Sequence, residues 1–302
     1  MKVLVSDPIA EEGIKRLRAA GIEVEVKTGL PPEELREIIS EYDGLIVRSA
    51  TKVTREVIEA GENLKAIGRA GIGLDNIDTE AAKERGIKVL NTPGATTISV
   101  AELTLGHMLA LARHIPQGTA SLKAGKWEKK RLIGTELYGK TLGIIGLGRI
   151  GREVAKRASA FGMDLVAYDP YVREGDVRNL GLKLLPLEDL LQHSDYITIH
   201  VPLTPETKHM LGKREFELMR PGVRLINCSR GGVVDEQALY EALVSGKVAG
   251  AALDVFEEEP PEDNPLLKLD NVIATPHLGA SAEEGQLRAG IEVAEKMIAA
   301  LS

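Results

Sequence analysis

Residues that could bind an anion and exchange a proton follow apolar segments in the second half of the chain. Arg230 follows the segment 223–229, and His277 follows the segment 271–276. An arginine binds a carboxylate and polarises a carbonyl group, and a histidine exchanges protons near neutral pH. With a carboxylate to orient the histidine, these groups suit the oxidation of a hydroxy acid.

Other residues compete for these roles. His200 also ends an apolar segment, so the pattern alone leaves both His200 and His277 open as the acid–base residue. Cys228 ends a further apolar segment and is more typical of a small buried hydrophobic residue than of a nucleophile. Of the remaining histidines, His107 and His114 lie on an expected helix and are expected to pack or to face solvent. His193 and His209 are expected at the surface.

The acidic run DVFEEEPPEDNP at 254–265 could supply the orienting carboxylate. Asp254 ends an apolar segment, which predicts that it lies at the carboxyl edge of a sheet. Spacing does not choose among Glu257, Glu258 and Glu259. The acidic side chains that take no part in chemistry are expected to be solvated charges.

A glycine-rich turn, Gly146-x-Gly148-x-x-Gly151, follows the apolar residues 142–145 and runs into a helical pattern. The first glycine allows a tight turn, the second lets backbone approach a pyrophosphate, and the third lets helix and strand pack closely. A second apolar segment ends at Asp169, 18 residues after Gly151. A carboxylate there accepts hydrogen bonds from a ribose diol and repels a 2′-phosphate, so the pattern predicts binding of NAD in preference to NADP.

The elements that must position these residues alternate along the chain. Short β-branched apolar segments alternate with helical patterns, which predicts α/β architecture with two doubly wound parallel-sheet domains. A buried connecting helix is expected at 97–115 and a closing helix near 282–301. Strands are expected, among other places, at 2–7, 44–50, 140–148, 164–170, 196–203, 223–229, 248–255 and 271–276.

Composition narrows the class of protein. A net charge of −7 and a pI near 5.6 disfavour nucleic acid and anionic membranes as partners. No apolar run reaches the ~18 residues of a membrane span, and the N-terminus lacks the apolar core of a signal peptide. The single cysteine fits a reducing compartment, so a cytoplasmic protein is expected. Abundant Lys, Arg and Glu with scarce Asn and Gln are typical of thermophiles.

Six ordered motifs carry a resemblance that spans essentially the whole chain: GRAGIGLDNID, NTPGATTISVAEL, GTELYGKTLGIIGLGRIGREVA, INCSRGGVVDEQAL, GAALDVFEEEPP and TPHLGAS. Together they resemble the D-isomer-specific 2-hydroxyacid dehydrogenases. The resemblance implies a flavodoxin-like substrate domain of 1–92 plus 277–302 and a Rossmann NAD-binding domain of 93–276. It also implies a homodimer, formed through the NAD-binding domain and an arm at 116–137.

The resemblance assigns catalytic roles as well. Arg230 in CSRGG matches the family's substrate-clamping arginine, and His277 in TPHLG matches its acid–base residue. Glu259 in EEEPP matches the carboxylate that pairs with this histidine. No metal site is implied. Contacts with NAD are expected from Ile72, Gly146, Gly148, Arg149, Ile150, Gly151, Asp169, His200, Val201, Cys228, Ser229, Arg230, Asp254, His277, Gly279 and Ala280.

Within the family, the motifs are most similar to members that oxidise D-3-phosphoglycerate with NAD. A small phosphorylated 2-hydroxy acid is therefore the implied substrate. Position 96, often Asn in the family's substrate loop, is Thr here. The side-chain contact that Asn makes with substrate in the family therefore does not carry over directly to this chain. The substrate-binding residues implied are Arg48, Ser49, Gly73, Thr96 and, on the arm that reaches a neighbouring subunit, Lys130 and Arg131.

Two alternatives stay open. A glyoxylate or hydroxypyruvate reductase on the same scaffold would use an unphosphorylated substrate and should not need Arg48. An NAD(H)-sensing scaffold, like the family's transcriptional corepressors, would keep the same triad without turnover. The sequence stops at Ser302 without the C-terminal regulatory domain of many longer relatives, so we expect no feedback inhibition by serine.

Overall fold

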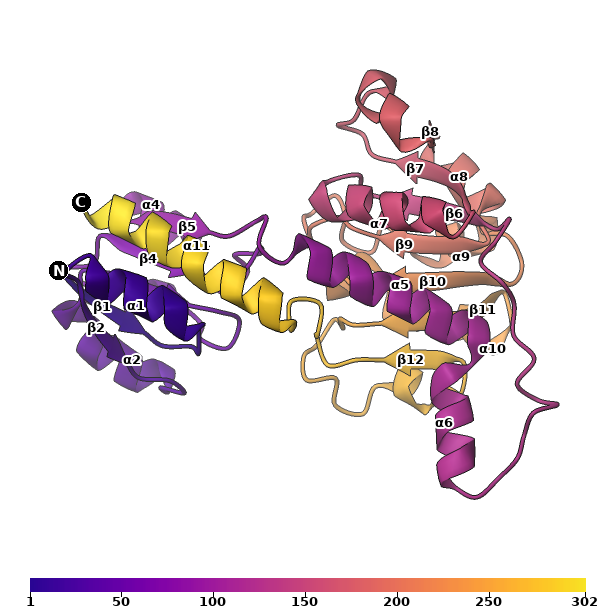
Figure 1. Ribbon diagram of the computed structural model, residues 1–302, viewed down its shortest axis with the longest axis horizontal. Helices are drawn as coiled ribbons and strands as arrows, with labels where there is room; N and C mark the ends of the chain where they lie inside the picture. The colour runs from indigo at the N-terminus through magenta and orange to yellow at the C-terminus, as the bar shows by residue number, and fades with distance from the viewer. The chain divides into compact units, whose positions relative to one another are not determined.

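The computed structural model describes residues 1–302. The chain divides into two compact units, Met1–Thr97 with Ala280–Ser302, and Ile98–Gly279. Each unit is built on one sheet whose strands all pair in parallel, with helices packed on its faces (Figure 1). The predicted fold class, α/β with two doubly wound parallel sheets, is therefore confirmed.

The first unit carries a five-stranded sheet in the order β2-β1-β3-β4-β5. Helix α11 packs along α1 and against β4. This crossing requires glycine, because a Cβ atom at Gly13 would lie 2.3 Å from the carbonyl oxygen of Gly290. The strands are β1 (Lys2–Val5), β2 (Glu23–Val26), β3 (Gly44–Val47), β4 (Ala66–Arg69) and β5 (Lys88–Asn91). The helices are α1 (Glu11–Ala19), α2 (Pro32–Ile38), the 3-10 helix η1 (Ile39–Glu41), α3 (Arg55–Ala60), α4 (Thr79–Glu84) and α11 (Glu283–Leu301).

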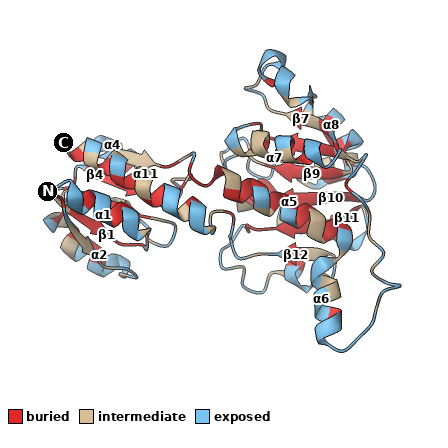
Figure 2. Cartoon of the chain, viewed as in Figure 1, coloured by how far each residue is buried: buried red, intermediate tan, exposed pale blue.

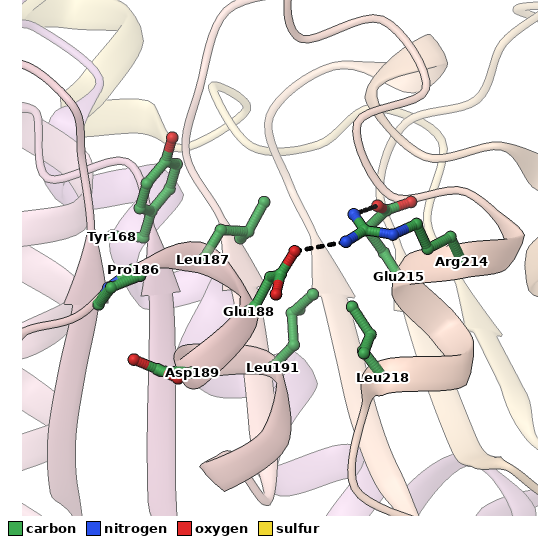
Figure 3. Close-up of a pocket in the computed structure, with 9 residues that line it drawn as sticks. All are labelled: Tyr168, Pro186, Leu187, Glu188, Asp189, Leu191, Arg214, Glu215 and Leu218. Atoms are coloured by element: carbon green, nitrogen blue, oxygen red, sulfur yellow. Dashed lines mark hydrogen bonds and ion pairs between the residues drawn. The ribbon is translucent and has the colours of Figure 1, made fainter.

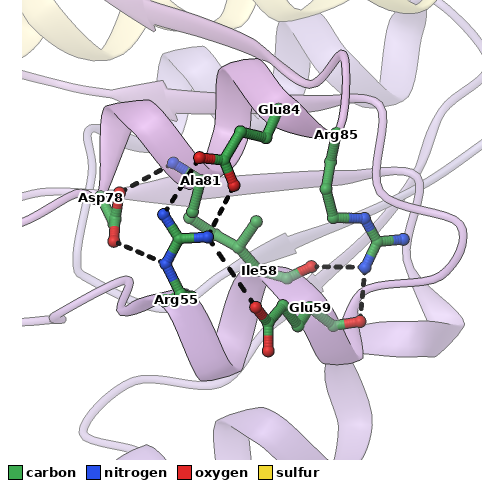
Figure 4. Close-up of polar contacts among 7 residues, drawn as sticks. All are labelled: Arg55, Ile58, Glu59, Asp78, Ala81, Glu84 and Arg85. Atoms are coloured by element: carbon green, nitrogen blue, oxygen red, sulfur yellow. Dashed lines mark hydrogen bonds and ion pairs between the residues drawn. The ribbon is translucent and has the colours of Figure 1, made fainter.

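Ion pairs fasten α3 to α4 on the surface of the first unit (Figure 4). The Arg55 guanidinium lies 2.7 Å from Glu84 and 3.7 Å from Asp78. Arg85 donates from its guanidinium to the carbonyl oxygens of Ile58 (3.1 Å) and Glu59. Exposed pairs of this kind contribute ~0–1 kcal/mol each, so the cluster is best explained as a structural surface network.

The second unit carries a seven-stranded sheet in the order β12-β11-β10-β9-β6-β7-β8. The strand order changes direction between β6 and β9, the topological switch point of a doubly wound sheet. Its strands are β6 (Thr141–Ile145), β7 (Asp164–Tyr168), β8 (Lys183–Leu184), β9 (Tyr196–Ile199), β10 (Val223–Asn227), β11 (Val248–Leu253) and β12 (Val272–Ala274). Its helices are α5 (Thr97–Arg113), α6 (Ile115–Lys123), α7 (Arg149–Ala160), η2 (Glu174–Leu180), α8 (Leu187–His193), α9 (Lys213–Leu218), η3 (Gly231–Val233), α10 (Glu236–Val244) and η4 (Pro265–Lys268).

Strands end earlier than the sequence pattern predicts. The strand expected at 2–7 ends at Val5, and the one expected at 44–50 ends at Val47. The carboxylate of Asp7 accepts hydrogen bonds from the backbone N–H groups of Arg48 (2.6 Å) and Thr51 (3.1 Å), which turns the chain out of the sheet. The residues beyond the strand ends therefore form the loops that carry the predicted site.

The expected connecting helix at 97–115 is present as α5, which ends at Arg113. His114, with φ of 52°, separates it from α6, so the first part of the expected arm at 116–137 is helical. The rest of the arm is irregular and exposes Trp127 (81%) and Ile133 (79%).

The central strands of both sheets are buried (Figure 2). Val3, Leu4 and Val5 of β1 and the whole of β9 have no exposed surface. Burial on both faces explains why these strands are continuous apolar runs instead of alternating patterns. None of the helices combines the length and apolar character needed to cross a membrane.

Candidate active site

The backbone at 146–151 fits the phosphates of a dinucleotide. Gly146 has φ of 91°, and a Cβ atom there would lie 2.6 Å from the carbonyl oxygen of His200. A Cβ atom at Gly151 would lie 2.2 Å from the Gly146 carbonyl oxygen, whereas nothing lies within 4 Å of one at Gly148. Gly148 precedes Arg149 and Ile150 at the start of α7, where free N–H groups and the helix dipole attract an anion. These residues fit the pyrophosphate of NAD.

Asp169 follows β7 and supports the glycine-rich turn. Its Oδ2 accepts a hydrogen bond from Leu147 N (2.8 Å), and its Oδ1 accepts one from Tyr171 N (2.9 Å). An ionised carboxylate can accept at about four lone-pair positions. Asp169 is half-buried and therefore keeps capacity for the hydroxyls of a ribose.

His200 follows β9 and borders the same turn. Its Nε2 lies 3.0 Å from Thr198 Oγ1, and its buried Nδ1 has no protein partner. Burial lowers the pKa of His200 to about 3, so the ring is neutral at physiological pH and poorly suited to exchange protons there. Its carbonyl oxygen and the Val201 side chain both lie against Gly146, which favours a place beside the dinucleotide.

Asn227, which the sequence did not single out, shapes the turn that carries Arg230. Its Oδ1 accepts hydrogen bonds from the backbone N–H (3.0 Å) and hydroxyl (2.8 Å) of Ser229, and its Nδ2 donates to the Arg230 carbonyl (2.8 Å). The turn lies directly against the acidic run, because a Cβ atom at Gly231 would lie 1.8 Å from the Phe256 carbonyl oxygen. Glycine at 231 therefore lets the two segments meet.

His277 and Glu259 form a hydrogen-bonded pair at the end of the acidic run. Nδ1 of His277 lies 2.8 Å from Oε2 of Glu259, and Oε1 of Glu259 accepts from Phe256 N (3.1 Å). The two side chains are 43% and 38% exposed, so the imidazole is accessible. Burial disfavours the charged form of Glu259, but the hydrogen bond and charge of His277, with the charge of Arg230, outweigh it and lower the pKa of Glu259. The second unit thus brings Arg230, Glu259 and His277 together.

The Asp254 carboxylate contacts the loop on both sides of His277. The side chain is 1% exposed. Its Oδ1 accepts from the Thr275 hydroxyl (2.5 Å) and Leu278 N (2.7 Å), and its Oδ2 accepts from Gly279 N (2.7 Å). As predicted, Asp254 lies at the carboxyl edge of the sheet, directly after β11. Its carboxylate faces the loop of His277.

Glu257 is exposed, as expected of a solvated charge, but its carboxylate also has specific partners. Its Oε1 lies 3.1 Å from Nε2 of His209 and accepts from the backbone N of Glu236 (3.1 Å). The backbone N of Glu257 in turn donates to the Glu236 carboxylate (2.7 Å). Glu257 therefore fastens the acidic run to the start of α10, and the chain holds two histidine–carboxylate pairs in this region.

In the first unit, further residues predicted to bind substrate or NAD lie in the loops that follow β3 and β4. Asn76, also not predicted, donates from Nδ2 to the carbonyls of Arg48 (2.8 Å) and Thr51 (2.6 Å) and so fixes the turn of Arg48 and Ser49. Ser49 is exposed and Arg48 half-buried. Nearby carbonyls are also held by side chains, since Asn91 donates to Ile72 O (2.7 Å) and Arg69 donates to Gly73 O.

Of two cavities in the structure, only the smaller is lined by predicted site residues. One, of about 10 Å³, is lined by Arg48, Thr96 and Ala280 in the first unit, and it holds a single water at most. The other, of about 400 Å³, lies in the second unit and contains none of the predicted site residues (Figure 3). There Arg214 is paired with Glu188 and with Glu215 (3.3 Å). The larger cavity therefore does not mark the chemistry.

Lys130 and Arg131 are exposed on the arm, where Arg131 pairs with Glu128 (2.7 Å). No group of three or more His, Cys, Asp or Glu side chains is arranged to hold a metal ion. The candidate site combines a dinucleotide turn, an arginine and an accessible histidine–carboxylate pair.

Comparison with known proteins places this site in a family. Residues 105–279 match the family described as "D-isomer specific 2-hydroxyacid dehydrogenase, NAD binding domain". The match includes the glycine-rich turn and all of Arg230, Glu259 and His277. The chain belongs to this family. The predicted cofactor, NAD, is confirmed at the level of the domain.

Individual proteins extend the likeness over the whole chain. The D-3-phosphoglycerate dehydrogenase of Methanocaldococcus jannaschii is 60% identical, with 98% of this chain and 57% of that protein covered. The hydroxypyruvate reductase of Thermotoga maritima is 57% identical, with 98% and 97% covered. The solved TT0316 protein from Thermus thermophilus is 40% identical with a TM-score of 0.92, covering 100% and 97%. The chain spans little more than half of the first relative and nearly all of the second.

Proposed function

We propose that this chain oxidises D-3-phosphoglycerate to 3-phosphohydroxypyruvate with NAD, the first step of serine biosynthesis. The observation that carries the proposal is the hydrogen-bonded pair of His277 and Glu259 beside Arg230, within the NAD-binding unit. The 60% identity to the D-3-phosphoglycerate dehydrogenase of M. jannaschii supports this choice of substrate.

His277 takes the proton in this mechanism. An ionised carboxylate only accepts hydrogen bonds, so Glu259 favours the tautomer of His277 that carries its proton on Nδ1. The lone pair on Nε2 then removes the proton of the C2 hydroxyl, and Glu259 stabilises the imidazolium that forms. Bound NAD supplies the acceptor for the hydride that leaves C2.

Arg230 holds the substrate. Its positively charged guanidinium matches a carboxylate with two parallel hydrogen bonds. In the reverse reaction the same charge polarises the keto oxygen at C2. Asn227 fixes the backbone of this turn, so the guanidinium starts from a rigid mount.

The phosphate of the substrate would be bound by side chains other than Arg230, Glu259 and His277. We propose that residues 1–92 with 277–302 form the substrate domain and that residues 93–276 form the NAD-binding domain. Arg48 and Ser49 would bind the phosphate from the first unit, with Lys130 and Arg131 contributed by the arm of a second subunit.

A second candidate is a hydroxypyruvate reductase, favoured by the T. maritima relative, which matches over nearly its full length. The two candidates differ at Arg48. Replacing Arg48 by Ala should reduce kcat/KM for D-3-phosphoglycerate by ~10–100-fold more than for D-glycerate, because a charge-assisted contact to phosphate is lost. Equal losses for both substrates would favour the reductase.

We also infer a homodimer that uses the 116–137 arm. Trp127 and Ile133 are large apolar side chains left exposed on this arm, which is typical of an interaction surface. Light scattering after size-exclusion chromatography should report twice the mass of one chain, and Trp127→Ser should shift it towards the monomer. A wild-type monomer would contradict the inference.

The substrate panel is the direct test of the proposed function. NADH formation is followed with D-3-phosphoglycerate, D-glycerate, D-lactate and the L enantiomers. The proposal predicts the highest kcat/KM for D-3-phosphoglycerate and none for L enantiomers. A higher value for D-glycerate would contradict the assigned substrate, and no turnover of any D-2-hydroxy acid would contradict the dehydrogenase itself.

A further inference from the structure

Four side chains behind the His277 loop form one continuous row in the second unit. Cys228 Sγ lies 3.7 Å from Nδ1 of His107, and Nε2 of His107 lies 3.2 Å from the Thr275 hydroxyl. The Thr275 hydroxyl lies 2.5 Å from Oδ1 of Asp254. His107, Cys228 and Asp254 are at most 6% exposed, so water does not compete for these groups.

The row has one direction. The Asp254 carboxylate accepts, so the Thr275 hydroxyl must donate its only proton to it. That hydroxyl can then only accept from His107, which puts a proton on Nε2. Nδ1 of His107 is left as an acceptor for the Cys228 thiol. The hydrogen bonds therefore run from Cys228 through His107 and Thr275 to Asp254.

Burial keeps His107 and Cys228 in the forms that this direction requires. Burial lowers the pKa of His107, which leaves the ring neutral with a single proton. Burial, with the nearby charge of Asp254, raises the pKa of the Cys228 thiol to about 12, so the thiol keeps its proton and donates. The same effect excludes Cys228 and His107 as a nucleophilic pair, because no thiolate forms.

The row ends on the loop of the acid–base residue. Asp254 accepts hydrogen bonds from Leu278 N and Gly279 N, and its own carbonyl accepts from His277 N (2.9 Å). His277 has φ of 52°, a left-handed conformation that is uncommon for a residue with a Cβ atom and needs support from its surroundings. The donor from Thr275 helps fix the carboxylate that provides this support.

We propose that His107 is a positioning residue for the reaction: its Nε2–H orients the Thr275 hydroxyl onto Asp254, and Asp254 holds the loop on which His277 stands. This inference rests on the proposed function, because it concerns the placement of its acid–base residue. It assigns a role to a residue on α5, far in sequence from the loop that it orients.

The first test reads the tautomer in the wild-type protein. Long-range proton–nitrogen NMR on protein labelled with nitrogen-15 histidine distinguishes a proton on Nε2 from one on Nδ1, and the His107 signals are those lost in His107→Leu. We expect a neutral ring protonated on Nε2. A proton on Nδ1, or a doubly protonated ring at pH 7, would overturn the directional row whether or not any substrate is turned over.

The second test compares variants in steady-state assays with D-3-phosphoglycerate and NAD. His107→Leu should lower kcat about tenfold while changing the KM for NAD by less than about twofold, the scale of one lost buried hydrogen bond. His107→Gln, whose amide can donate near the position of Nε2, should recover most of the loss. His193→Leu, a change at an exposed histidine on α8, is the control and should leave kcat unchanged.

Unchanged kcat in His107→Leu, or equal losses in the Leu and Gln variants, would refute the positioning role. If His107→Leu does not fold, Thr275→Val and Thr275→Ser make the same comparison, since only Ser keeps the hydroxyl. A wild-type protein without activity on any D-2-hydroxy acid would instead refute the proposed function, and the NMR result would still decide the hydrogen-bond row.

Discussion

Replacing Glu259 by Gln tests the pairing at the centre of the site. The change keeps the size of the side chain and its acceptor for Phe256 N, but it removes the charge that faces His277. The amide of Gln can also donate to Nδ1, which would move the histidine proton to Nε2. That tautomer cannot accept the proton of the C2 hydroxyl.

The size of the effect follows from the geometry of the pair. A hydrogen bond between charged groups contributes ~1.5–3 kcal/mol. Both side chains are more than a third exposed, so solvent screening reduces this to ~1–2 kcal/mol. Since ~1.4 kcal/mol is a factor of ten, kcat should fall ~5–30-fold in Glu259→Gln.

The chain offers a matched control at Glu257, which pairs with His209 at 3.1 Å and with similar exposure. Initial rates of NADH formation are measured for Glu259→Gln and Glu257→Gln at saturating NAD. We expect the first to lose activity and the second to keep it. Rates within about twofold of wild type for Glu259→Gln, or equal losses in both variants, would refute the assignment.

Three further predictions concern the scaffold and the cofactor. Glu25 accepts hydrogen bonds from Lys27, Tyr42 and Lys2, which lower its pKa to about 2. The wild type should therefore melt at a higher temperature than Glu25→Gln, with the largest difference above pH ~4.3. This difference should disappear as the pH falls towards 2. Gly231→Ala, whose Cβ atom would meet the Phe256 carbonyl at 1.8 Å, should lower both melting temperature and kcat, measured on the same sample. Asp169→Ser should raise the ratio of kcat/KM for NADP over NAD by about tenfold or more, and an unchanged ratio would refute the ribose assignment.

The fold was predictable because the central strands of both sheets are buried on both faces. These central strands are largely apolar runs that stand out in the sequence. Strand ends were less predictable: the strand expected at 196–203 ends at Ile199, and the short edge strand β8 was not foreseen. Edge strands of two residues carry too little apolar pattern to stand out from a loop.

The acidic run shows the limit for the site. Spacing could not choose among Glu257, Glu258 and Glu259, and only the family resemblance selected Glu259. In the structure, Glu259 and Glu257 have different partners. Glu259 contacts His277, 18 residues away, and Glu257 contacts His209, 48 residues away. Such contacts depend on which loops the sheet brings together.

His107 shows the same limit on a helix. The sequence leaves open whether His107 packs or faces solvent, and the structure buries it. Its partners, Cys228 and Thr275, lie 121 and 168 residues away along the chain. A polar residue buried in an apolar helix is a sign that a partner exists, but it does not name that partner.

The most direct test of the account is the rate of NADH formation by His277→Ala with D-3-phosphoglycerate, alongside its affinity for NADH measured by cofactor fluorescence. The account predicts that kcat falls by at least ~100-fold, the scale of a lost general acid–base group, while NADH binding stays as in wild type. Turnover near the wild-type rate in this variant would contradict His277 as the residue that takes the substrate proton.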